Sequence, residues 1–197
     1  MIKAVLFDCF SVLIGDATKA AVQELSYASP DKAEQFRAAT RAVDSGIMTE
    51  EEVRPLQASL LGISENELTA LRDSGEVRNV ELINYIRTTL KGKYKLALVS
   101  NIGSRSHLEK RFLPNELDEL FDVVIASGDV GAIKPNPEIY YLAAARLGID
   151  PQEGVMIDDI ESFCIGARDV GMHAIYFKNT KQAISNLEQL IDSSNKS

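Results

Sequence analysis

Four short polar segments of the chain hold the residue types that could do chemistry, and each lies where an apolar run ends: residues 6–10, 98–101, 133–135 and 156–159. The candidate side chains in these segments are Asp8, Ser100, Asn101, Lys134, Asp158 and Asp159. A carboxylate nucleophile, a hydroxyl group, a cation and an acidic metal site together indicate phosphoryl or related group transfer through an aspartyl intermediate.

Five short apolar runs predict the buried strands that would position these side chains: residues 3–7, 95–100, 123–127, 154–157 and 173–177. Segments with helical spacing lie between them, such as residues 137–147, where Gly148 follows as a stop signal. The alternation predicts an α/β fold with right-handed crossovers and a doubly wound parallel sheet. Because ligands bind outside the carboxyl ends of the strands in such sheets, we expect the candidate side chains to share one pocket.

The segment between the first two strands has a different pattern, because amphipathic stretches dominate it and no strand is evident. These stretches are residues 17–27, 30–44, 49–61 and 65–74. Ser64 with Glu67, and Thr49 with Glu52, have the spacing of a capping box at a helix N-terminus. We therefore expect a core domain of residues 1–13 and 81–197 and an all-helical cap domain of residues 14–80, which would exclude water and select the substrate.

The composition argues against several classes of protein. The 197 residues are 45% hydrophobic and 25% charged, which suits one globular α/β domain with an insertion. The net charge of -8 argues against nucleic-acid and anionic-membrane partners, which require a basic surface. No apolar run approaches the roughly 18–20 residues of a membrane span, and residues 1–5 lack a signal-peptide layout. Two cysteines make no disulfide framework, so we expect a cytoplasmic protein.

Taken together, the motifs resemble those of the haloacid dehalogenase superfamily, in the form that carries a helical C1-type cap after the first motif. The resemblance covers nearly the whole chain, and all four family motifs occur in the family's order. Each motif alone is weakly specific, whereas four motifs near predicted strand ends are specific together. The resemblance implies a Rossmann-like core, a phosphatase-like hydrolase activity and a Mg²⁺ cofactor.

The resemblance also implies a role for each candidate. Asp8 is similar to the family's nucleophile, and Ser100 and Asn101 to the residues that bind the transferring group. Lys134 would orient Asp8 and neutralise charge on the phosphoryl oxygens. Simpler structural roles stay open: Asp8 could cap the next loop, Ser100 or Asn101 could be a helix N-cap, and Lys134 could be a solvated surface residue.

The acidic pair Asp158 and Asp159 is similar to the family's metal-binding motif. Two adjacent acids repel each other unless a cation lies close by, and a hard divalent ion such as Mg²⁺ fits oxygen ligands. By resemblance, Asp159 would bind the metal and Asp158 would be an accessory residue, with Asp8 and the backbone carbonyl of Phe10 as further ligands. The alternative is a loop in which one acid of the pair is a helix N-cap.

Phe10 is the main departure from the family pattern. Phosphatases of the family carry an Asp at this position as general acid and base, and Phe10 cannot transfer a proton. Removing a positioned acid or base costs about 10²- to 10⁴-fold in rate. Ser11 and Val12 replace the usual Gly and Thr of the next turn, and Phe163 replaces a polar residue near the metal site. The family's dehalogenases also have an aromatic residue at the position of Phe10, but they lack the acidic pair that this chain retains.

Two functions are compatible with these residues. The first is a Mg²⁺-dependent phosphatase that acts on a small phosphorylated metabolite through an aspartyl-phosphate at Asp8, with activity weakened by Phe10. The second is a catalytically impaired module of the same fold that binds a phosphorylated ligand or regulates another process. Arg37, Arg41 and Arg54 are candidate anion contacts from the cap, although a solvated helix face also accounts for them.

Overall fold

The computed structural model of the protein describes residues 1–194 and contains one sheet of five parallel strands. The strands are β1 (Ala4–Phe7), β2 (Lys95–Ser100), β3 (Val123–Ala126), β4 (Gly154–Asp158) and β5 (His173–Tyr176). They lie in the order β3-β2-β1-β4-β5, so β1 is at the centre between β2 and β4. The predicted α/β class and all five strands are confirmed, with ends that differ by at most one residue.

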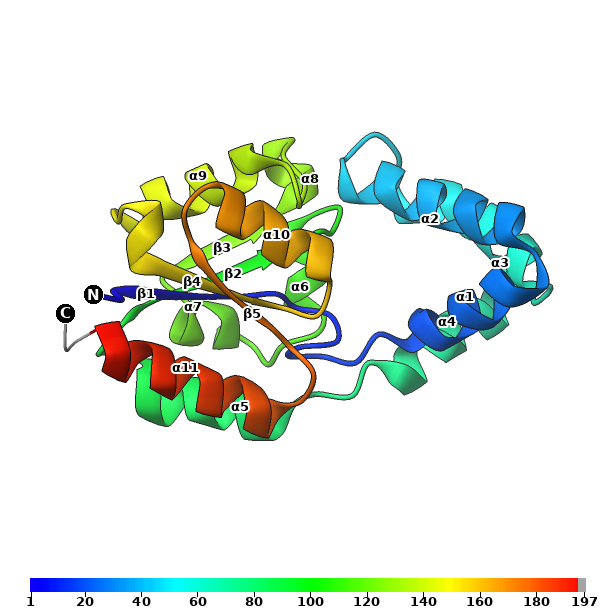
Figure 1. Ribbon diagram of the computed structural model, residues 1–197. Helices are drawn as coiled ribbons and strands as arrows, with labels where there is room; N and C mark the ends of the chain where they lie inside the picture. The colour runs from blue at the N-terminus through cyan, green and yellow to red at the C-terminus, as the bar shows by residue number, and fades with distance from the viewer. Residues whose placement is uncertain (195–197) are drawn as a thin grey trace.

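Helices cover both faces of this sheet, as Figure 1 shows. Val5 and Phe7 of β1 face one apolar cluster, while Ala4 and Leu6 face the other, because successive strand side chains point to opposite faces. The first cluster is covered by α5 (Val80–Tyr85), the π-helical turn η1 (Ile86–Leu90), α6 (Arg105–Glu109), α7 (Glu116–Leu120) and α11 (Thr180–Ser194). The second is covered by α9 (Pro137–Leu147) and α10 (Glu161–Asp169). The sheet is therefore doubly wound, with the short helices α8 (Ser127–Val130) and η2 (Pro151–Glu153) in its connections.

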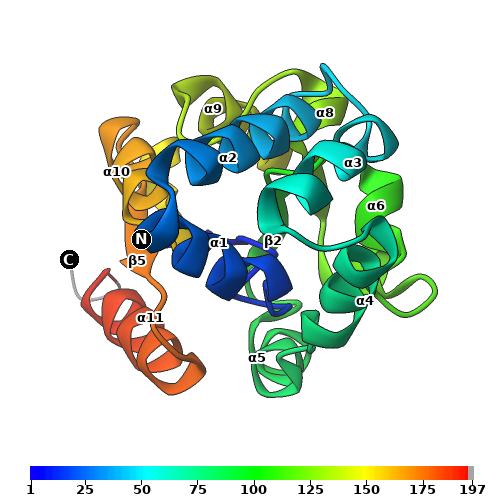
Figure 2. The same ribbon diagram turned by 90° about the vertical axis from the view of Figure 1, so that its right-hand side faces the viewer.

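The insertion after β1 is entirely helical, as predicted. It consists of α1 (Ala17–Ala28), α2 (Pro30–Asp44), α3 (Glu50–Leu61) and α4 (Glu65–Gly75). Both predicted capping boxes are formed, at Thr49 and at Ser64. Each helix packs on the next and α4 returns to α1, which closes the bundle that Figure 2 shows from its outer side. Across the described residues, no helix combines the length and the apolar character needed to cross a bilayer.

Two linkers run side by side between the core and the cap. The backbone amide of Gly15 donates to Val77, and that of Asn79 donates to Leu13, both at 2.8 Å. A side chain at Gly75 would lie 2.3 Å from the Cβ of Ala17, so only glycine allows this close approach. The paired linkers fix how the cap leaves the core.

The cap contacts the core a second time, through the C-terminus of α2. The hydroxyl of Ser127, the first residue of α8, donates a 2.5 Å hydrogen bond to the backbone carbonyl of Asp44. A Cβ at Gly128 would lie 2.2 Å from the carbonyl oxygen of Gly103, so this junction is closely packed as well. The linkers and this junction hold the cap over the carboxyl ends of the strands.

Candidate active site

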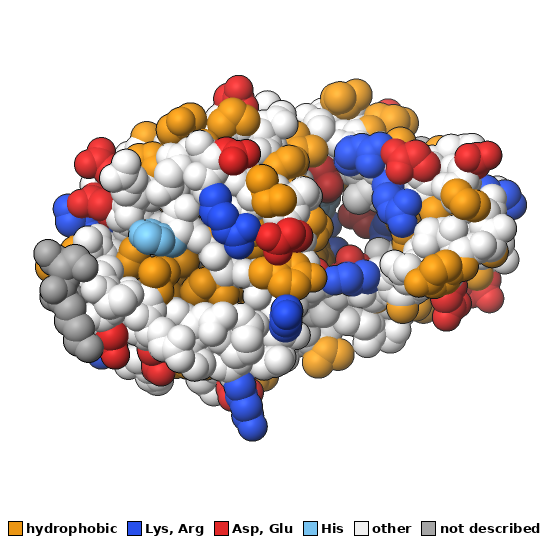
Figure 3. Space-filling model, in the orientation of Figure 1, with side chains coloured by type: hydrophobic (Ala, Val, Ile, Leu, Met, Phe, Trp, Pro, Cys, Tyr) orange, Lys and Arg blue, Asp and Glu red, His pale blue; other side chains and the backbone are white. Residues whose placement is uncertain are grey.

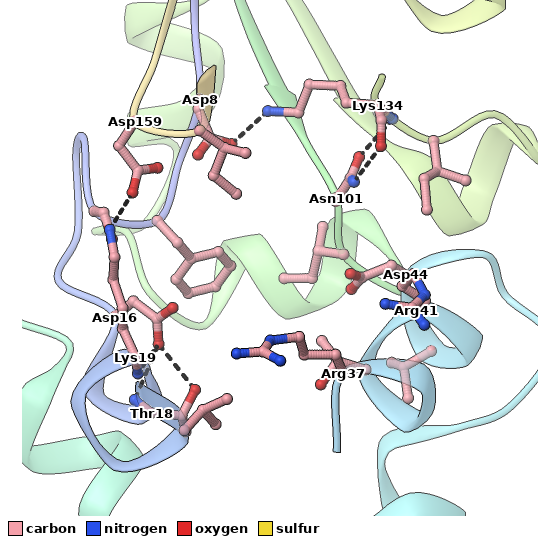
Figure 4. Close-up of a pocket in the computed structure, with 18 of the residues that line it drawn as sticks. Asp8, Asp16, Thr18, Lys19, Arg37, Arg41, Asp44, Asn101, Lys134 and Asp159 are labelled. Carbon is pink, nitrogen blue, oxygen red and sulfur yellow. Dashed lines mark hydrogen bonds and ion pairs between the residues drawn. The ribbon is translucent and has the colours of Figure 1, made fainter. Parts of the chain in front are cut away.

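The candidate side chains converge at the carboxyl ends of β1, β2 and β4, beneath the cap. A pocket of about 820 Å³ lies there between core and cap, and Figure 3 shows it as a hollow with charged side chains around it. Asp8, Asn101, Lys134 and Asp159 line this pocket (Figure 4). Ser100 and Asp158 are fully buried behind the lining. The topology thus brings the predicted residues into one place, although two of them do not reach the pocket surface.

Lys134 is a buried cation that bridges two carboxylates. Its Nζ lies 2.7 Å from Oδ1 of Asp8 and 2.6 Å from Oδ2 of Asp158, and its side chain is 0% exposed. Burial lowers the pKa of Lys134, but the carboxylates of Asp158 and Asp8 outweigh it and raise the pKa above the usual value. Lys134 therefore stays protonated. A solvated surface lysine is ruled out by this burial.

Asn101 holds the backbone of Lys134 in place. Its Nδ2 donates to the carbonyl of Lys134 at 3.0 Å, and its Oδ1 accepts from the amide of Lys134 at 2.9 Å. The ring of Phe163 adds a cation–π contact, with its centroid 5.1 Å from Nζ of Lys134. The sequence predicts a direct contact of Asn101 with the transferring group and indicates only that a polar residue is missing at Phe163, so neither contact with Lys134 follows from it. In the structure, both side chains orient the lysine.

Asp8, Asp158 and Asp159 form an acidic cluster, in which one ligand atom from each lies within 4.8 Å of the others. Burial raises the pKa of Asp8 to about 7; Lys134 lowers it and Asp158 raises it further. Three carboxylates this close together suit a hard divalent cation, which prefers oxygen ligands and reduces their mutual repulsion. The alternative, in which one acid of the pair is a helix N-cap, is not realised: Ile160 is the N-cap of α10, and Oδ1 of Asp158 accepts from the amide of Ile160 ahead of the helix.

Ser100, the last residue of β2, carries a hydroxyl group without a hydrogen-bond partner within residues 1–194. The residue is 0% exposed, and its Oγ is one of two buried side-chain atoms without a hydrogen-bond partner in the described residues; the other is Nε of Arg111. Buried hydroxyl groups in native proteins nearly always have partners. The Ser100 hydroxyl therefore keeps an unused hydrogen-bonding capacity behind the pocket lining.

A sequence model of haloacid dehalogenase-like hydrolases matches residues 2–171 of the chain. The chain belongs to this family. The resemblance inferred from the motifs is confirmed, as is the helical cap inserted after β1.

Three similar proteins illustrate the relationship. Over 75 residues the chain is 43% identical to bifunctional epoxide hydrolase 2 of Mus musculus, which covers 38% of this chain and 14% of that protein. Over 89 residues it is 35% identical to glyceraldehyde 3-phosphate phosphatase of Pyrococcus abyssi, covering 45% of this chain and 37% of that protein. The matches thus span well under half of either relative's length. A Bacteroides thetaiotaomicron family enzyme, solved with magnesium and inorganic phosphate, has the same fold, with a TM-score of 0.70 at 23% identity over 90% of this chain and 95% of that one.

In this haloacid dehalogenase-like hydrolase, the side chain of Phe10 packs against a cation. The guanidinium of Arg111 lies 5.3 Å from the centroid of the Phe10 ring, and its Nη2 bonds Glu76 of the second linker at 2.7 Å. The turn that follows Asp8 is nevertheless formed: the amide of Leu13 donates to the carbonyl of Cys9 at 2.8 Å. Ser11 adopts the left-handed conformation there, with φ of 59°, which costs a non-glycine residue about 1–2 kcal/mol.

Several pocket residues of the cap and of α6 were not identified from the sequence. Lys19 of α1 reaches Asp159 of the acidic cluster with an Nζ–Oδ2 distance of 2.5 Å. Asp44, at the end of α2, and His107 of α6 also line the pocket. None of them belongs to a family motif, and no local pattern in the sequence indicates which face of the cap turns toward the core.

The three candidate anion contacts of the cap differ in their positions. Arg37 and Arg41 line the pocket, whereas Arg54 does not. Arg41 is bonded to Glu34 at 2.6 Å, but Arg37 lies only within 4.0 Å of the same carboxylate. Figure 4 shows the Arg37 guanidinium extended into the pocket, which leaves it the freer of the two for an anionic ligand.

Proposed function

We propose that the protein is a Mg²⁺-dependent phosphatase that hydrolyses a small phosphorylated metabolite through an aspartyl-phosphate at Asp8. The observation that carries this proposal is the arrangement around Asp8. Its carboxylate is bonded to the buried ammonium of Lys134 and lies within the acidic cluster of Asp158 and Asp159, at the base of a pocket beneath the cap. A nucleophile, a fixed cation and a site for a divalent metal in one pocket are the parts that phosphoryl transfer requires.

The reaction would have two steps. A carboxylate oxygen of Asp8 attacks phosphorus, the bond from phosphorus to the leaving oxygen breaks, and that oxygen keeps the electron pair and takes up a proton. Water then attacks the same phosphorus, the bond to Asp8 breaks, and inorganic phosphate leaves. Lys134 would neutralise negative charge on the transferring group, and the free hydroxyl of Ser100 would donate a hydrogen bond to it.

The proposed Mg²⁺ site consists of Asp8, Asp159, the backbone carbonyl of Phe10, and Asp158 as an accessory residue. When bound, the ion would reduce the charge on the phosphoryl oxygens. The acidic cluster and the unsatisfied Ser100 hydroxyl both support a site for a metal and an oxyanion. The phosphatase from Pyrococcus abyssi and the Bacteroides enzyme solved with magnesium and phosphate are consistent with this assignment.

The cap would choose the substrate. We propose that residues 14–80 form the cap domain and that residues 1–13 and 81–197 form the core, of which the last three residues lie outside the described part of the chain. Asn101 would act on the transferring group indirectly, through Lys134, and Arg37 would contact an anionic part of the substrate. The net charge of -8 argues against a nucleic-acid partner.

A second candidate function follows from Phe10. Without a proton-transferring side chain at this position, the protein could bind a phosphorylated ligand and Mg²⁺ without turnover and act as a regulatory module. The contact between Phe10 and Arg111 favours it, because it fills the place where the family's phosphatases hold an acid.

Hydrolysis of 4-nitrophenyl phosphate with Mg²⁺ or with EDTA separates these functions. We expect the wild type to turn over only with Mg²⁺, Asp8→Asn to be inactive, and Phe10→Asp to be faster. Asp31→Asn, on the exposed start of α2 outside the pocket, is the matched control and should behave as wild type. A wild type that binds Mg²⁺ and phosphate but is inert, with activity only in Phe10→Asp, would establish the binding module instead.

A further inference from the structure

The proposed reaction needs a group that gives a proton to the leaving oxygen, and Phe10 has none to give. Six acidic side chains line the pocket. Five of them accept hydrogen bonds or form ion pairs: Asp8, Asp16, Glu50, Glu76 and Asp159. In the described residues, no hydrogen bond or ion pair engages the carboxylate of the sixth, Asp44.

Asp44 is the last residue of α2 and belongs to the cap. Figure 4 shows its carboxylate directed into the pocket, across from Asp159 and below Asp8 and Lys134. It is therefore a carboxyl group that faces the nucleophile from the opposite side of the pocket and has no structural partner of its own.

The backbone of Asp44 is held in place. Its carbonyl accepts the 2.5 Å hydrogen bond from Ser127, a side chain that is 0% exposed. The same hydroxyl accepts from the amide of Ile102 at 2.9 Å, next to Asn101 in the loop after β2. A residue tied to the core in this way keeps its position relative to Asp8, as proton transfer requires.

The surroundings of Asp44 suit a group that gains and loses a proton near neutral pH. Burial raises the pKa of Asp44 to about 7, with Asp8 raising it and Lys134 lowering it. Other charged or ionisable side chains that line the same pocket are Arg37 and Arg41, on the same helix as Asp44, and His107 on α6. A general acid works best when its pKa lies near the working pH.

The direction of attack determines on which side of the pocket the leaving oxygen lies. In phosphoryl transfer the attacking and leaving oxygens lie roughly in line through phosphorus. With Asp8 as nucleophile at the core end, the leaving oxygen points toward the cap. We propose that Asp44 is the general acid and base of this enzyme, and that it takes over from the cap the role that Phe10 cannot perform; this inference rests on the proposed function.

The reaction then needs no other proton donor or acceptor, because Asp44 serves as both. In the first step the O–P bond to Asp8 forms, the P–O bond to the leaving group breaks, and the leaving oxygen takes the proton of the Asp44 carboxyl group. In the second step the Asp44 carboxylate takes a proton from the attacking water, whose oxygen bonds phosphorus as the bond to Asp8 breaks. Asp44 is protonated again when phosphate leaves.

Two substrates with different leaving groups test this role. 4-Nitrophenyl phosphate releases a stable phenolate and needs little protonation, whereas phenyl phosphate needs it more. We expect Asp44→Asn to lose about 10²- to 10³-fold in kcat/KM on phenyl phosphate, within the range for a positioned acid, and less than about tenfold on 4-nitrophenyl phosphate. Asp44→Glu should recover part of the loss. Because the first step needs an ionised Asp8 and a protonated Asp44, wild-type kcat/KM on phenyl phosphate should rise and then fall with pH, and only the fall should be absent in Asp44→Asn.

Two matched variants control for the pocket. Asp16→Asn removes another pocket-lining cap carboxylate, and His107→Gln removes the imidazole that lines the pocket from α6. Neither substitution should change the ratio of kcat/KM on phenyl phosphate to kcat/KM on 4-nitrophenyl phosphate. Thermal unfolding and Mg²⁺ titration of each variant show whether the fold and the metal site are kept.

The outcomes separate this inference from the proposed function. Equal losses on both substrates in a folded Asp44→Asn protein would mean a structural role and overturn the inference alone. A selective loss in His107→Gln instead would also overturn it. A wild type inert on both esters would overturn the proposed function and this inference with it.

Discussion

The ammonium of Lys19 lies 2.5 Å from a carboxylate oxygen of Asp159, so the first cap helix is bonded to the acidic cluster of the core. Lys19 also lies 3.5 Å from the hydroxyl of Ser11 in the turn after Asp8. A cap residue thus forms an ion pair with one of the carboxylates of the acidic cluster. Cap position and metal binding are therefore expected to influence each other.

Removing this ammonium should strengthen Mg²⁺ binding. In Lys19→Gln, Mg²⁺ no longer competes with a lysine for Asp159. Because Lys19 is largely exposed and such pairs are weak, we expect a gain of about two- to fivefold in Mg²⁺ affinity, measured by calorimetric titration. Lys32→Gln, on the exposed side of α2, changes the net charge equally and should leave the affinity as it is. An unchanged or lower affinity in Lys19→Gln would contradict the competition.

Lys134→Met should destabilise the fold. The substitution leaves Asp8 and Asp158 buried without their shared cation, and breaking a buried ion pair from one side costs about 3–5 kcal/mol. Urea unfolding measures the loss, and added Mg²⁺ should recover part of it because the ion replaces the missing charge. Lys110→Met, an exposed lysine after α6, is the control. A loss below about 1 kcal/mol would place Lys134 in the range of surface pairs and contradict its assigned role.

The sequence alone was sufficient to predict the sheet and the candidate residues at the carboxyl ends of its strands. Buried parallel strands are continuous apolar runs, and parallel strands end at one edge, so Asp8, Ser100 and Asp158 could be brought together from their positions alone. The cap helices could be predicted in the same way, because each is long enough to show its period and two carry capping boxes.

The short helices and the cap side of the pocket could not be predicted. Helices α6, α7 and α8 have at most five residues, too few for a periodic pattern, and depend on tertiary packing. Lys19 and Asp44 reach the pocket because the linkers and the α8 junction turn one cap face toward the core. That orientation is a long-range property that no local pattern encodes.

The stability of the protein should depend on the protonation of Asp44. Its folded-state pKa of about 7 lies above the ordinary 3.8, so between these values the folded protein binds more protons than the unfolded chain, and stability falls as pH rises. The Asp44→Asn protein lacks this pH-dependent loss of stability. Its stability relative to wild type should rise by roughly 1–3 kcal/mol from pH 4 to pH 8, since one pKa unit corresponds to about 1.4 kcal/mol.

Urea unfolding of both proteins at the two pH values measures this difference, and no turnover is needed. Asp31→Asn supplies the control, because Asp31 is exposed on the same helix. A relative stability of Asp44→Asn that does not change with pH would mean that Asp44 titrates as an ordinary surface carboxylate.

Ser127→Ala should act on both stability and chemistry. The hydroxyl bonds the carbonyl of Asp44 and the amide of Ile102, and leaving buried polar groups without a partner costs about 1–3 kcal/mol each. Because the lost bond also holds the end of α2, the carboxylate of Asp44 would be less well positioned. Hydrolysis of phenyl phosphate should then fall more than that of 4-nitrophenyl phosphate, in the same direction as in Asp44→Asn but by a smaller factor.

Ser59→Ala, on the exposed side of α3, is the matched control for this substitution and should change neither quantity. If Ser127→Ala lowers stability but leaves the ratio of the two substrates unchanged, the α8 junction holds the cap without positioning Asp44. A change in the ratio links the junction directly to proton transfer, since no atom of Ser127 lines the pocket.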